Sequence, residues 1–579
     1  MMKKAIAISL VLATALAMDV NAQQGPVRED GPRTPNPGPG NPNPGPGNPN
    51  PGPGNPNPGP GNPNPGPGNP NPGPGNPNPG PGNPNPGQGN QNLEQQLQQL
   101  VEQLELDSIS AEGLPSIEDP LPQLGKSLFF TKNLGGEQSA ACVSCHHPVL
   151  GGSDELSLSV GVEAINELNE SAHDLLGHGR FNGNDSNNLP SVPRNAPTIF
   201  NAGLNEQRMF WDGRVERQNN GQIITPDSEV NRRGNLRADN NLPEGATLAA
   251  AQARFPVTSP DEMRGDFEFD LDNEAYRQVL AERLNDTDTL WSASFELAYN
   301  DDEVTFDRIA EAIGEYERSM VFINSPWNRY LSGESDALSD EEKAGAVLFF
   351  SNANQGGAGC GTCHSGSTLS GRGFQLVAFP QFGPGKGNPG VATNNQDFGR
   401  ENITGDNEDR YHFRAPSLLN IAVTAPYGHT GAYQTLEEVV RHYSNPRQSI
   451  NRLFAARNGE PFTNNNAPFC DLPQVADLIN KTGQTCESLY PDAYDNSIQV
   501  VEHLQNVRNG DVPARFPLRG SPNLNQQEVS QLVAFMEALT DPCVLDRDCL
   551  DPWIVDHDEE ANFPDDLPLI AEDRDGHSL

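Results

Sequence analysis

The chain has 579 residues, enough for several domains, but its 57 glycines and 54 prolines indicate that part of it cannot form a packed core. Its formal net charge of −41 at pH 7, from 37 basic and 78 acidic residues, disfavours binding to nucleic-acid phosphates. The same charge favours a basic partner protein.

The N-terminus has the pattern of a secretory signal peptide. Two lysines precede an apolar run that ends in a small-residue cleavage pattern, Val20–Ala22, which predicts removal of residues 1–22. The run is short for a membrane anchor and is interrupted by Ser9 and Asp19. Because no later segment is apolar enough to cross a bilayer, we expect a periplasmic or otherwise exported protein, with surface association left open.

Residues 23–92 are dominated by proline, glycine and asparagine. Six perfect copies of NPNPGPG occupy residues 41–82, and one NPNPGQG copy follows at residues 83–89. Proline removes backbone donors and glycine removes side chains, so this segment cannot bury a core. It is expected to be a disordered linker.

A short amphipathic helix is predicted over residues 93–106. Leu93, Leu97, Leu100 and Leu104 are spaced by four, three and four residues, which puts them on one helix face. Self-association and packing back onto the rest of the chain both remain open.

The composition becomes globular from about residue 107. Helical patterns recur in residues 306–323, 339–350, 435–443 and 525–539. Ser339 gives a helix-cap signal at the start of the range 339–350. The helical patterns are separated by long connections rich in Gly, Asn and Asp, and no run of alternating strands appears. The fold class is therefore predicted to be mainly α. The acidic segment 551–579 is expected to be an exposed extension.

Four of the eight cysteines lie in two C-x-x-C-H motifs, residues 142–146 and 360–364. In such a motif two thiols add to the vinyl groups of a haem, and the next histidine is then held beneath the iron. Two c-type haems are predicted, with axial ligands His146 and His364 and with covalent anchors Cys142, Cys145, Cys360 and Cys363. A zinc site with four thiolates is the main competitor, but it leaves both histidines unexplained.

The remaining cysteines have no histidine at ligand spacing. Cys470 and Cys486 lie close together, as do Cys543 and Cys549. In an exported protein this favours two local disulfides, 470 with 486 and 543 with 549.

An ordered series of motifs resembles the bacterial di-haem cytochrome c peroxidases and their MauG-type relatives. The resemblance extends from about Leu121 to Thr540. Its supporting stretches include RNAPTIFNAG (194–203), FWDGR (210–214), SPDEM (259–263), LSDEEKAGAVLFF (338–350) and FRAPSLLNIAVTAPYGHTGAYQTLEEVVRHY (413–443).

The resemblance implies two cytochrome c-like helical domains with one haem each. We expect a peroxidatic domain at residues 107–330, an electron-transfer domain at 331–545 and an acidic tail at 546–579. Hydrogen peroxide would be reduced at the first haem. The electrons would enter through the second haem from a small cytochrome c or copper protein, and a homodimer is left open.

For the second haem, the resemblance places the sixth iron ligand at Tyr443. A phenolate is a hard anionic donor that stabilises ferric or higher-valent iron. Neighbouring His442 stays open as an alternative ligand. The same region implies a calcium ion held by the backbone carbonyls of Thr424 and Pro426, since carbonyl oxygens suit this hard cation. His429 matches a family histidine near the haem.

For the first haem, the sequence departs from relatives that carry a second histidine ligand. The equivalent position is Val162, which cannot bind iron, so this haem is predicted to be five-coordinate or water-ligated. His173 or His178 remains an alternative if its loop folds back.

The sequence also departs from the family's distal acid–base pair, because the positions that the resemblance assigns to it hold Met209 and Asn219. Gln207 and Glu216, with Gln218 nearby, are candidate substitutes. Trp211 would pack near the haem, and we group it with Gln207 and Glu216 as the candidate catalytic residues.

Three functions remain in competition. The first is an exported di-haem peroxidase. The second is a MauG-type enzyme that oxidises an organic or protein substrate through high-valent iron. The third is a di-haem electron carrier without turnover, which the missing distal pair would favour.

Overall fold

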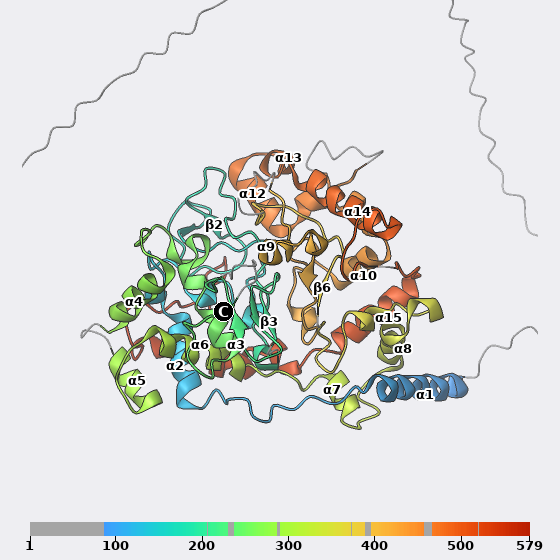
Figure 1. Ribbon diagram of the computed structural model, residues 1–579, viewed down its shortest axis with the longest axis horizontal. Coiled ribbons are helices and arrows are strands. Elements are labelled where there is room, and N and C mark those ends of the chain that lie inside the picture. Colours follow the sequence, from blue (N-terminus) through green and yellow to red (C-terminus); the bar gives the residue numbers. More distant parts are fainter. Residues whose placement is uncertain are drawn as a thin grey trace, which may run out of the picture. The chain divides into compact units, whose positions relative to one another are not determined.

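The computed structural model describes residues 86–579, except 205–206, 230–236, 286–289, 372, 388–394, 457–465 and 519, and its side chains from residue 92. The expected signal peptide and nearly all of the expected linker lie outside the described residues. The described part is mainly helical, as predicted (Figure 1). Its helices are α1 (Pro86–Leu104), α2 (Pro120–Phe130), α3 (Leu248–Ala253), α4 (Asn273–Leu284), α5 (Trp291–Tyr299), α6 (Phe306–Ser319), α7 (Pro326–Leu331), α8 (Asp340–Phe350), α9 (Glu401–Thr404), α10 (Leu436–Ser444), α11 (Pro446–Leu453), α12 (Pro473–Thr482), α13 (Cys486–Leu489), α14 (Ala493–Asn509), α15 (Gln526–Glu537), α16 (Arg547–Leu550) and α17 (His557–Glu560).

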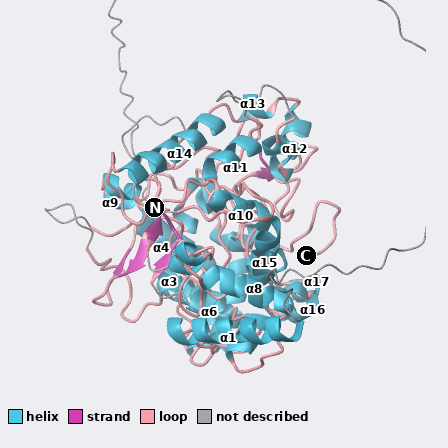
Figure 2. Ribbon diagram, turned by 90° about the vertical axis from the view of Figure 1, so that its right-hand side faces the viewer, coloured by secondary structure: helices cyan, strands magenta, loops and turns pink. Residues whose placement is uncertain are grey.

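The strands are only two or three residues long and form three small antiparallel sheets, which are the few magenta arrows in Figure 2. The sheets pair β1 with β2, β3 with β4 and β5, and β6 with β7. Their bounds are β1 (Ala164–Ile165), β2 (Phe181–Asn182), β3 (Arg208–Met209), β4 (Val215–Arg217), β5 (Ile223–Ile224), β6 (Phe374–Gln375) and β7 (Phe413–Arg414).

Two large hydrophobic cores organise these elements. One is built around α2, α4, α5 and α6, and the other around α8, α10, α14 and α15. Figure 1 shows α2, α5 and α6 on one side of the described part and α8, α10 and α15 on the other. Each C-x-x-C-H motif contributes to a different core, Cys142 to the first and Cys360 to the second.

The central helices of both cores begin where the sequence predicts. Ser339 caps α8 and forms a reciprocal capping box with Glu342. Thr435 and Glu438 do the same for α10. Each box satisfies backbone donors that the first helical turn leaves without partners.

A glycine lets two helices approach closely in each core. A Cβ atom on Gly125 of α2 would lie 2.0 Å from the carbonyl oxygen of Ala312 in α6. A Cβ atom on Gly345 of α8 would lie 1.9 Å from the carbonyl oxygen of Gln531 in α15. Both glycines are followed five residues later by the second phenylalanine of an LFF triplet, so the two cores repeat one packing device.

Helix α6 is shorter than the predicted segment 306–323. It ends at Ser319, and the backbone of Phe322 turns away to bind Asn201. The Phe322 N–H donates to Asn201 Oδ1 at 2.9 Å, and its carbonyl accepts from Asn201 Nδ2 at 3.2 Å. The side chain of Asn201, which is distant in sequence, therefore forms hydrogen bonds with backbone groups that would bond within the helix if it were longer.

Helix α1 packs back onto the rest of the chain, which is one of the two outcomes left open. Leu97 is fully buried in the core that contains α8. Glu94 forms an ion pair with Lys343 of α8 at 2.7 Å and accepts a hydrogen bond from Tyr330 at 3.1 Å. In Figure 1 this blue helix lies beside α7 and α8.

The expectation of an exposed C-terminal extension is wrong. Leu569 is 0% and Phe563 7% exposed, and both belong to the core around α2 and α6. The hydroxyl of Tyr316 donates to the Trp553 carbonyl at 2.6 Å, and the Trp553 indole donates to Ser319 at 3.0 Å. The segment folds back because its scattered apolar residues find a core that local composition does not reveal.

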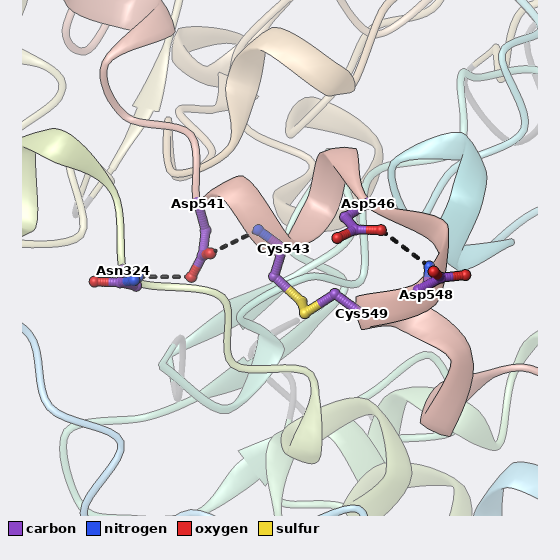
Figure 3. The surroundings of a disulfide bond; sticks show 6 residues. All are labelled: Asn324, Asp541, Cys543, Asp546, Asp548 and Cys549. Carbon is purple, nitrogen blue, oxygen red and sulfur yellow. Dashed lines mark hydrogen bonds between the residues drawn. A yellow bond between two sulfur atoms is a disulfide. The ribbon is translucent and has the colours of Figure 1, made fainter.

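Both predicted disulfides are present, Cys470 with Cys486 and Cys543 with Cys549. The second lies where the chain leaves α15 for the C-terminal segment (Figure 3). Next to it, Asp541 accepts hydrogen bonds from the N–H groups of Asn324 at 2.6 Å and Cys543 at 2.9 Å. The disulfide therefore closes a short turn that the buried carboxylate of Asp541 already holds in place.

Among the described helices, none has both the length and the apolar character needed to span a bilayer.

Candidate functional site

The first C-x-x-C-H motif forms a short 3₁₀ turn, Cys142–Ser144, that places its chemical groups together. Cys142 and Cys145 are half-buried free cysteines. The Nδ1 atom of His146 lies 3.2 Å from the Gly152 carbonyl oxygen. This contact suits a neutral ring that donates through Nδ1 and keeps Nε2 available to bind a metal. Burial lowers the pKa of His146, which also favours the neutral ring.

The second motif repeats this arrangement. Cys360 and Cys363 are free and half-buried, and His364 Nδ1 lies 3.1 Å from the Leu369 carbonyl oxygen. Burial again lowers the pKa of the histidine. Each ring also interacts with the carbonyl of a proline in an A-P-S/T sequence, Pro197 for the first and Pro416 for the second. The two histidines are therefore supported in the same way.

A cavity of about 840 Å³ lies against the second motif. Its volume falls in the range typical of cofactor sites. Cys360, Cys363 and His364 line it together with Tyr443 of α10. Two free thiols, a neutral histidine and a cavity of this size fit a covalently attached haem.

Tyr443 and His442 differ in what their side chains can do. Burial raises the pKa of Tyr443, and the phenol lines the cavity. Both ring nitrogens of His442 are already engaged, Nδ1 with the Tyr433 hydroxyl at 2.8 Å and Nε2 with the Val377 carbonyl at 2.9 Å. His442 is therefore poorly placed to bind iron, which leaves Tyr443 as the better candidate.

Trp211 contacts the segment that supports the first C-x-x-C-H motif and also lines the cavity beside the second motif. Its indole donates to the Asn195 carbonyl at 2.9 Å, and its own carbonyl accepts from the Arg414 N–H at 2.8 Å. It lines the cavity beside Asn195 and Phe413.

The position of Trp211 is fixed by a buried ion network. Arg194 binds Asp212 at 2.6 Å and Asp397 at 2.6 Å, and Arg214 adds a contact to Asp212 at 3.3 Å. The two arginines hold the pKa of Asp212 well below its usual range despite its burial. The FWDGR turn is therefore held by ion pairs of the buried Asp212 with Arg194 and Arg214.

Within the described part of the chain, no hydrogen bond or ion pair joins Gln207 or Glu216 to a haem motif. Gln207 is exposed. Glu216 is buried, but it is paired with Arg208 at 2.8 Å and with Arg400 at 2.5 Å. Such a doubly paired carboxylate is suited to fixing strand β4 rather than to exchanging protons. Met209 is half-buried and lines the second cavity, whereas Asn219 is exposed.

Val162 is buried in a segment that packs against the SPDEM turn. A Cβ atom on the preceding Gly161 would lie 2.2 Å from the Asp261 carbonyl oxygen and 2.3 Å from that of Glu262. The alternative histidines have other partners: His173 Nε2 lies 2.8 Å from the Ser171 hydroxyl, and His178 lies 3.9 Å from Asp477.

Sequence reasoning missed two carboxyl groups near the first motif. Glu262 lies close enough to His146 for its charge to oppose the lowering of the histidine pKa by burial. Glu317 is buried near Cys142, and burial raises its pKa to about 8. Glu262 belongs to the SPDEM motif, and Glu317 belongs to α6. The carboxylate within the SPDEM motif was therefore the sequence signal that could have identified Glu262.

Thr424 and Pro426 both line the second cavity, and the Ala425–Pro426 peptide bond is cis. In the described part of the chain, the one group of three acidic or metal-binding side chains with converging ligand atoms is Asp573, Asp575 and His577, which is not at this position. A cation here would therefore depend on backbone carbonyls.

The fold and these two motifs define a mainly helical protein with two c-type haem attachment sites. Residues 120–336 match the family model described as di-haem cytochrome c peroxidase. The chain is 29% identical over 334 residues to cytochrome c551 peroxidase of Nitrosomonas europaea, covering 58% of this chain and 75% of that protein.

Two further relatives extend the comparison. Cytochrome c551 peroxidase of Pseudomonas aeruginosa is 30% identical over 324 residues, covering 56% of this chain and 71% of that protein. The methylamine utilization protein MauG of Methylophilus methylotrophus is 25% identical over 351 residues, covering 60% of this chain and 79% of that protein. The chain belongs to the di-haem cytochrome c peroxidase and MauG family of oxidoreductases. Membership implies two c-type haems.

Proposed function

We propose that the protein is an exported di-haem peroxidase that reduces hydrogen peroxide at the haem held by Cys142, Cys145 and His146. Its electrons would pass through the haem held by Cys360, Cys363 and His364, from a small cytochrome c or copper protein. The observation that carries this proposal is the matched support of His146 and His364 by backbone carbonyls.

When bound, each haem would supply an iron that exchanges electrons. His146 and His364 would each bind through Nε2, with Nδ1 held by a carbonyl oxygen that orients the ring. Tyr443 would complete the second site. The apolar side chain of Val162 would leave a coordination position open at the first site, where peroxide can bind.

Peroxide reduction to water consumes two protons and two electrons, so the first site needs a proton carrier. Glu262 is the candidate that we favour, because its turn packs against the segment that carries Val162 and its charge acts on His146. Glu216, in contrast, is held by two arginines. Gln207 is exposed, and it would have only a supporting role in proton transfer.

Trp211 would lie on the route between the two haems. It contacts Asn195, two residues before the proline that supports His146, and it also lines the cavity of the second haem. This position supports a role in positioning the two sites for electron passage rather than in contacting peroxide.

The two cores support a division into domains at residues 107–330 and 331–545, each cytochrome c-like. The C-terminal segment 546–579 would belong structurally to the first domain because Leu569 and Phe563 lie in its core. Thr424 and Pro426 would offer carbonyl oxygens to one calcium ion between the domains.

A MauG-type oxidation of an organic or protein substrate is the second candidate, and Tyr443 favours it. An anionic oxygen ligand stabilises ferric and higher-valent iron and so suits storage of oxidising equivalents. Steady peroxide-dependent oxidation of a reduced small cytochrome by the purified protein would support the peroxidase. A peroxide reaction that occurs once and leaves the cytochrome reduced would support the MauG-type enzyme, and no reaction at all would support an electron carrier.

A further inference from the structure

Asp154 is a buried carboxyl group whose hydrogen bonding is incomplete. The residue is 1% exposed. Its Oδ1 atom accepts a hydrogen bond from the Leu156 N–H at 3.1 Å, whereas Oδ2 is buried without a hydrogen-bond partner among the described residues. A buried carboxylate that lacks a partner is costly to ionise, so this group tends to hold a proton.

Arg180 is the nearby cation, but its N–H groups are committed elsewhere. A guanidinium group has five N–H donors. All three nitrogens of Arg180 donate to backbone carbonyls at distances between 2.8 and 3.2 Å. The acceptors are the carbonyls of Val160, Gly161, Ala172, His173 and Leu175. Arg180 therefore acts on Asp154 through its charge at a distance and does not form a hydrogen-bonded ion pair with it.

The surroundings of Asp154 place it beside the first haem attachment site. Asp154 lies two residues after Gly152, whose carbonyl oxygen is 3.2 Å from His146 Nδ1, and the carbonyl of Ser153 between them accepts from the His147 N–H at 3.0 Å. The charge of Asp154 acts on Cys145, and the buried hydroxyl of Ser159 lies near both groups and lowers the pKa of each. His178, on the same segment as Arg180, is turned toward Asp477 and Glu155. Arg180 is thus the charged group with the largest effect on Asp154. Cys145 is coupled to Asp154 as well, but it no longer titrates once it is a thioether.

We infer that Asp154 is a redox-linked protonation site, which takes up a proton when the haem at Cys142 and Cys145 is reduced and releases it when that haem is oxidised. This inference rests on the proposed function, because it requires a haem at that motif. The glutamate of the SPDEM turn, Glu262, also acts on Cys145 and on His146, so the test must distinguish Asp154 from it by substitution.

Charge balance explains the coupling. On reduction, one electron from the external donor enters the haem and one proton from solvent enters Asp154, so the buried region gains no net charge. Burial raises the pKa of Asp154 to about 7, where a change of one charge on the haem can switch its protonation. By linkage, the proton must in turn change the affinity of the haem for the electron.

The test is a redox titration of the haem-loaded protein between pH 5 and pH 9, with the two haems resolved by their spectra. Haem content at the first motif is measured before any potential, so failure of the proposed function is seen separately. For the wild-type chain, the potential of the first haem should fall with pH around neutrality, with a slope approaching 59 mV per unit, the value for a tenfold change with one electron.

Asp154→Asn should flatten this slope, because the amide does not titrate. Glu155→Gln is the matched control, since Glu155 is the adjacent carboxyl group and is exposed. It should keep the wild-type slope. A retained slope in Asp154→Asn, or a flat wild-type profile with haem present, would overturn the inference.

A second measurement covers the case in which Asp154→Asn does not load haem. Infrared difference spectra of the wild-type protein should gain a protonated-carboxyl C=O band on reduction of the first haem, and the band should shift in D₂O. Absence of that band would also overturn the inference.

Discussion

Asn201 and Asn420 donate hydrogen bonds to the same oxygen atom, the carbonyl of Phe322, at 3.2 and 2.9 Å. Each asparagine lies four residues after a proline whose carbonyl interacts with a C-x-x-C-H histidine. The carbonyl of Phe322 therefore connects the two segments whose prolines interact with His146 and His364.

Replacing Asn420 by alanine should destabilise the protein more than replacing it by glycine. Its φ angle is +61°, which glycine adopts freely and alanine does not. Both variants lose the bonds to Phe322 and to the Asp541 N–H. We expect a loss of about 2–4 kcal/mol for alanine and about 1–2 kcal/mol less for glycine. Thermal unfolding followed by haem absorbance checks the order, and equal midpoints would argue against this conformational role.

Tyr443→Phe should open the sixth position of the second haem while leaving its covalent attachment intact. Phenylalanine keeps the ring and removes the oxygen that would bind iron. Absorbance and magnetic spectra should change from low spin to high spin for that haem alone. Tyr433→Phe is the control, because this neighbouring phenol instead contacts His442 at 2.8 Å. A low-spin signal that survives Tyr443→Phe would point to another ligand.

Trp211→Phe should slow the passage of electrons between the two sites without removing either haem. Phenylalanine retains an aromatic ring but loses the indole bond to Asn195 and is harder to oxidise. We expect a lower kcat with peroxide and an unchanged KM, measured with a reduced cytochrome as donor. Trp553→Phe is the control, since its indole binds Ser319 of α6. A normal kcat for Trp211→Phe would remove this residue from the route.

Leu569→Ala should destabilise the protein by roughly 2–5 kcal/mol, the cost of a cavity in a packed core. Leu569 is 0% exposed, whereas Leu545, in the turn closed by the second disulfide, is 71% exposed. Leu545→Ala should therefore change the stability by less than about 0.5 kcal/mol. If both variants unfold at the wild-type temperature, the C-terminal segment is not part of the first core.

The stability should fall between about pH 4 and pH 7 because of Asp154. Its ordinary pKa is 3.8, and burial raises it to about 7 in the folded protein. Over this range the folded state binds more protons than the unfolded chain, so the free energy of unfolding decreases as pH rises. The decrease is at most roughly 4 kcal/mol, from about three pKa units. Thermal midpoints at pH 5 and pH 8 should differ less for Asp154→Asn than for the wild-type chain, with Glu155→Gln as control.

The features that the sequence predicts correctly are local in the chain. The disulfides, the Ser339 cap and the two C-x-x-C-H motifs each depend on residues close in sequence. Their chemistry is therefore visible in short windows.

The features that it misses depend on contacts between distant residues. Asn201 ends α6 from more than a hundred positions away, and Glu262 reaches the His146 region from a separate turn. Leu569 lies in an acidic segment without helical periodicity, so its burial follows from the core that receives it. The repeated G-x-x-L-F-F sequences at Gly125 and Gly345 were a local signal of the twin cores that could have been used.

We expect the first haem to have an open iron position and the second to have none. Electron paramagnetic resonance of the resting protein, before and after addition of hydrogen peroxide, counts open positions directly. We predict one high-spin ferric signal that disappears with peroxide, beside one low-spin signal. Two low-spin signals that do not respond to peroxide would contradict it.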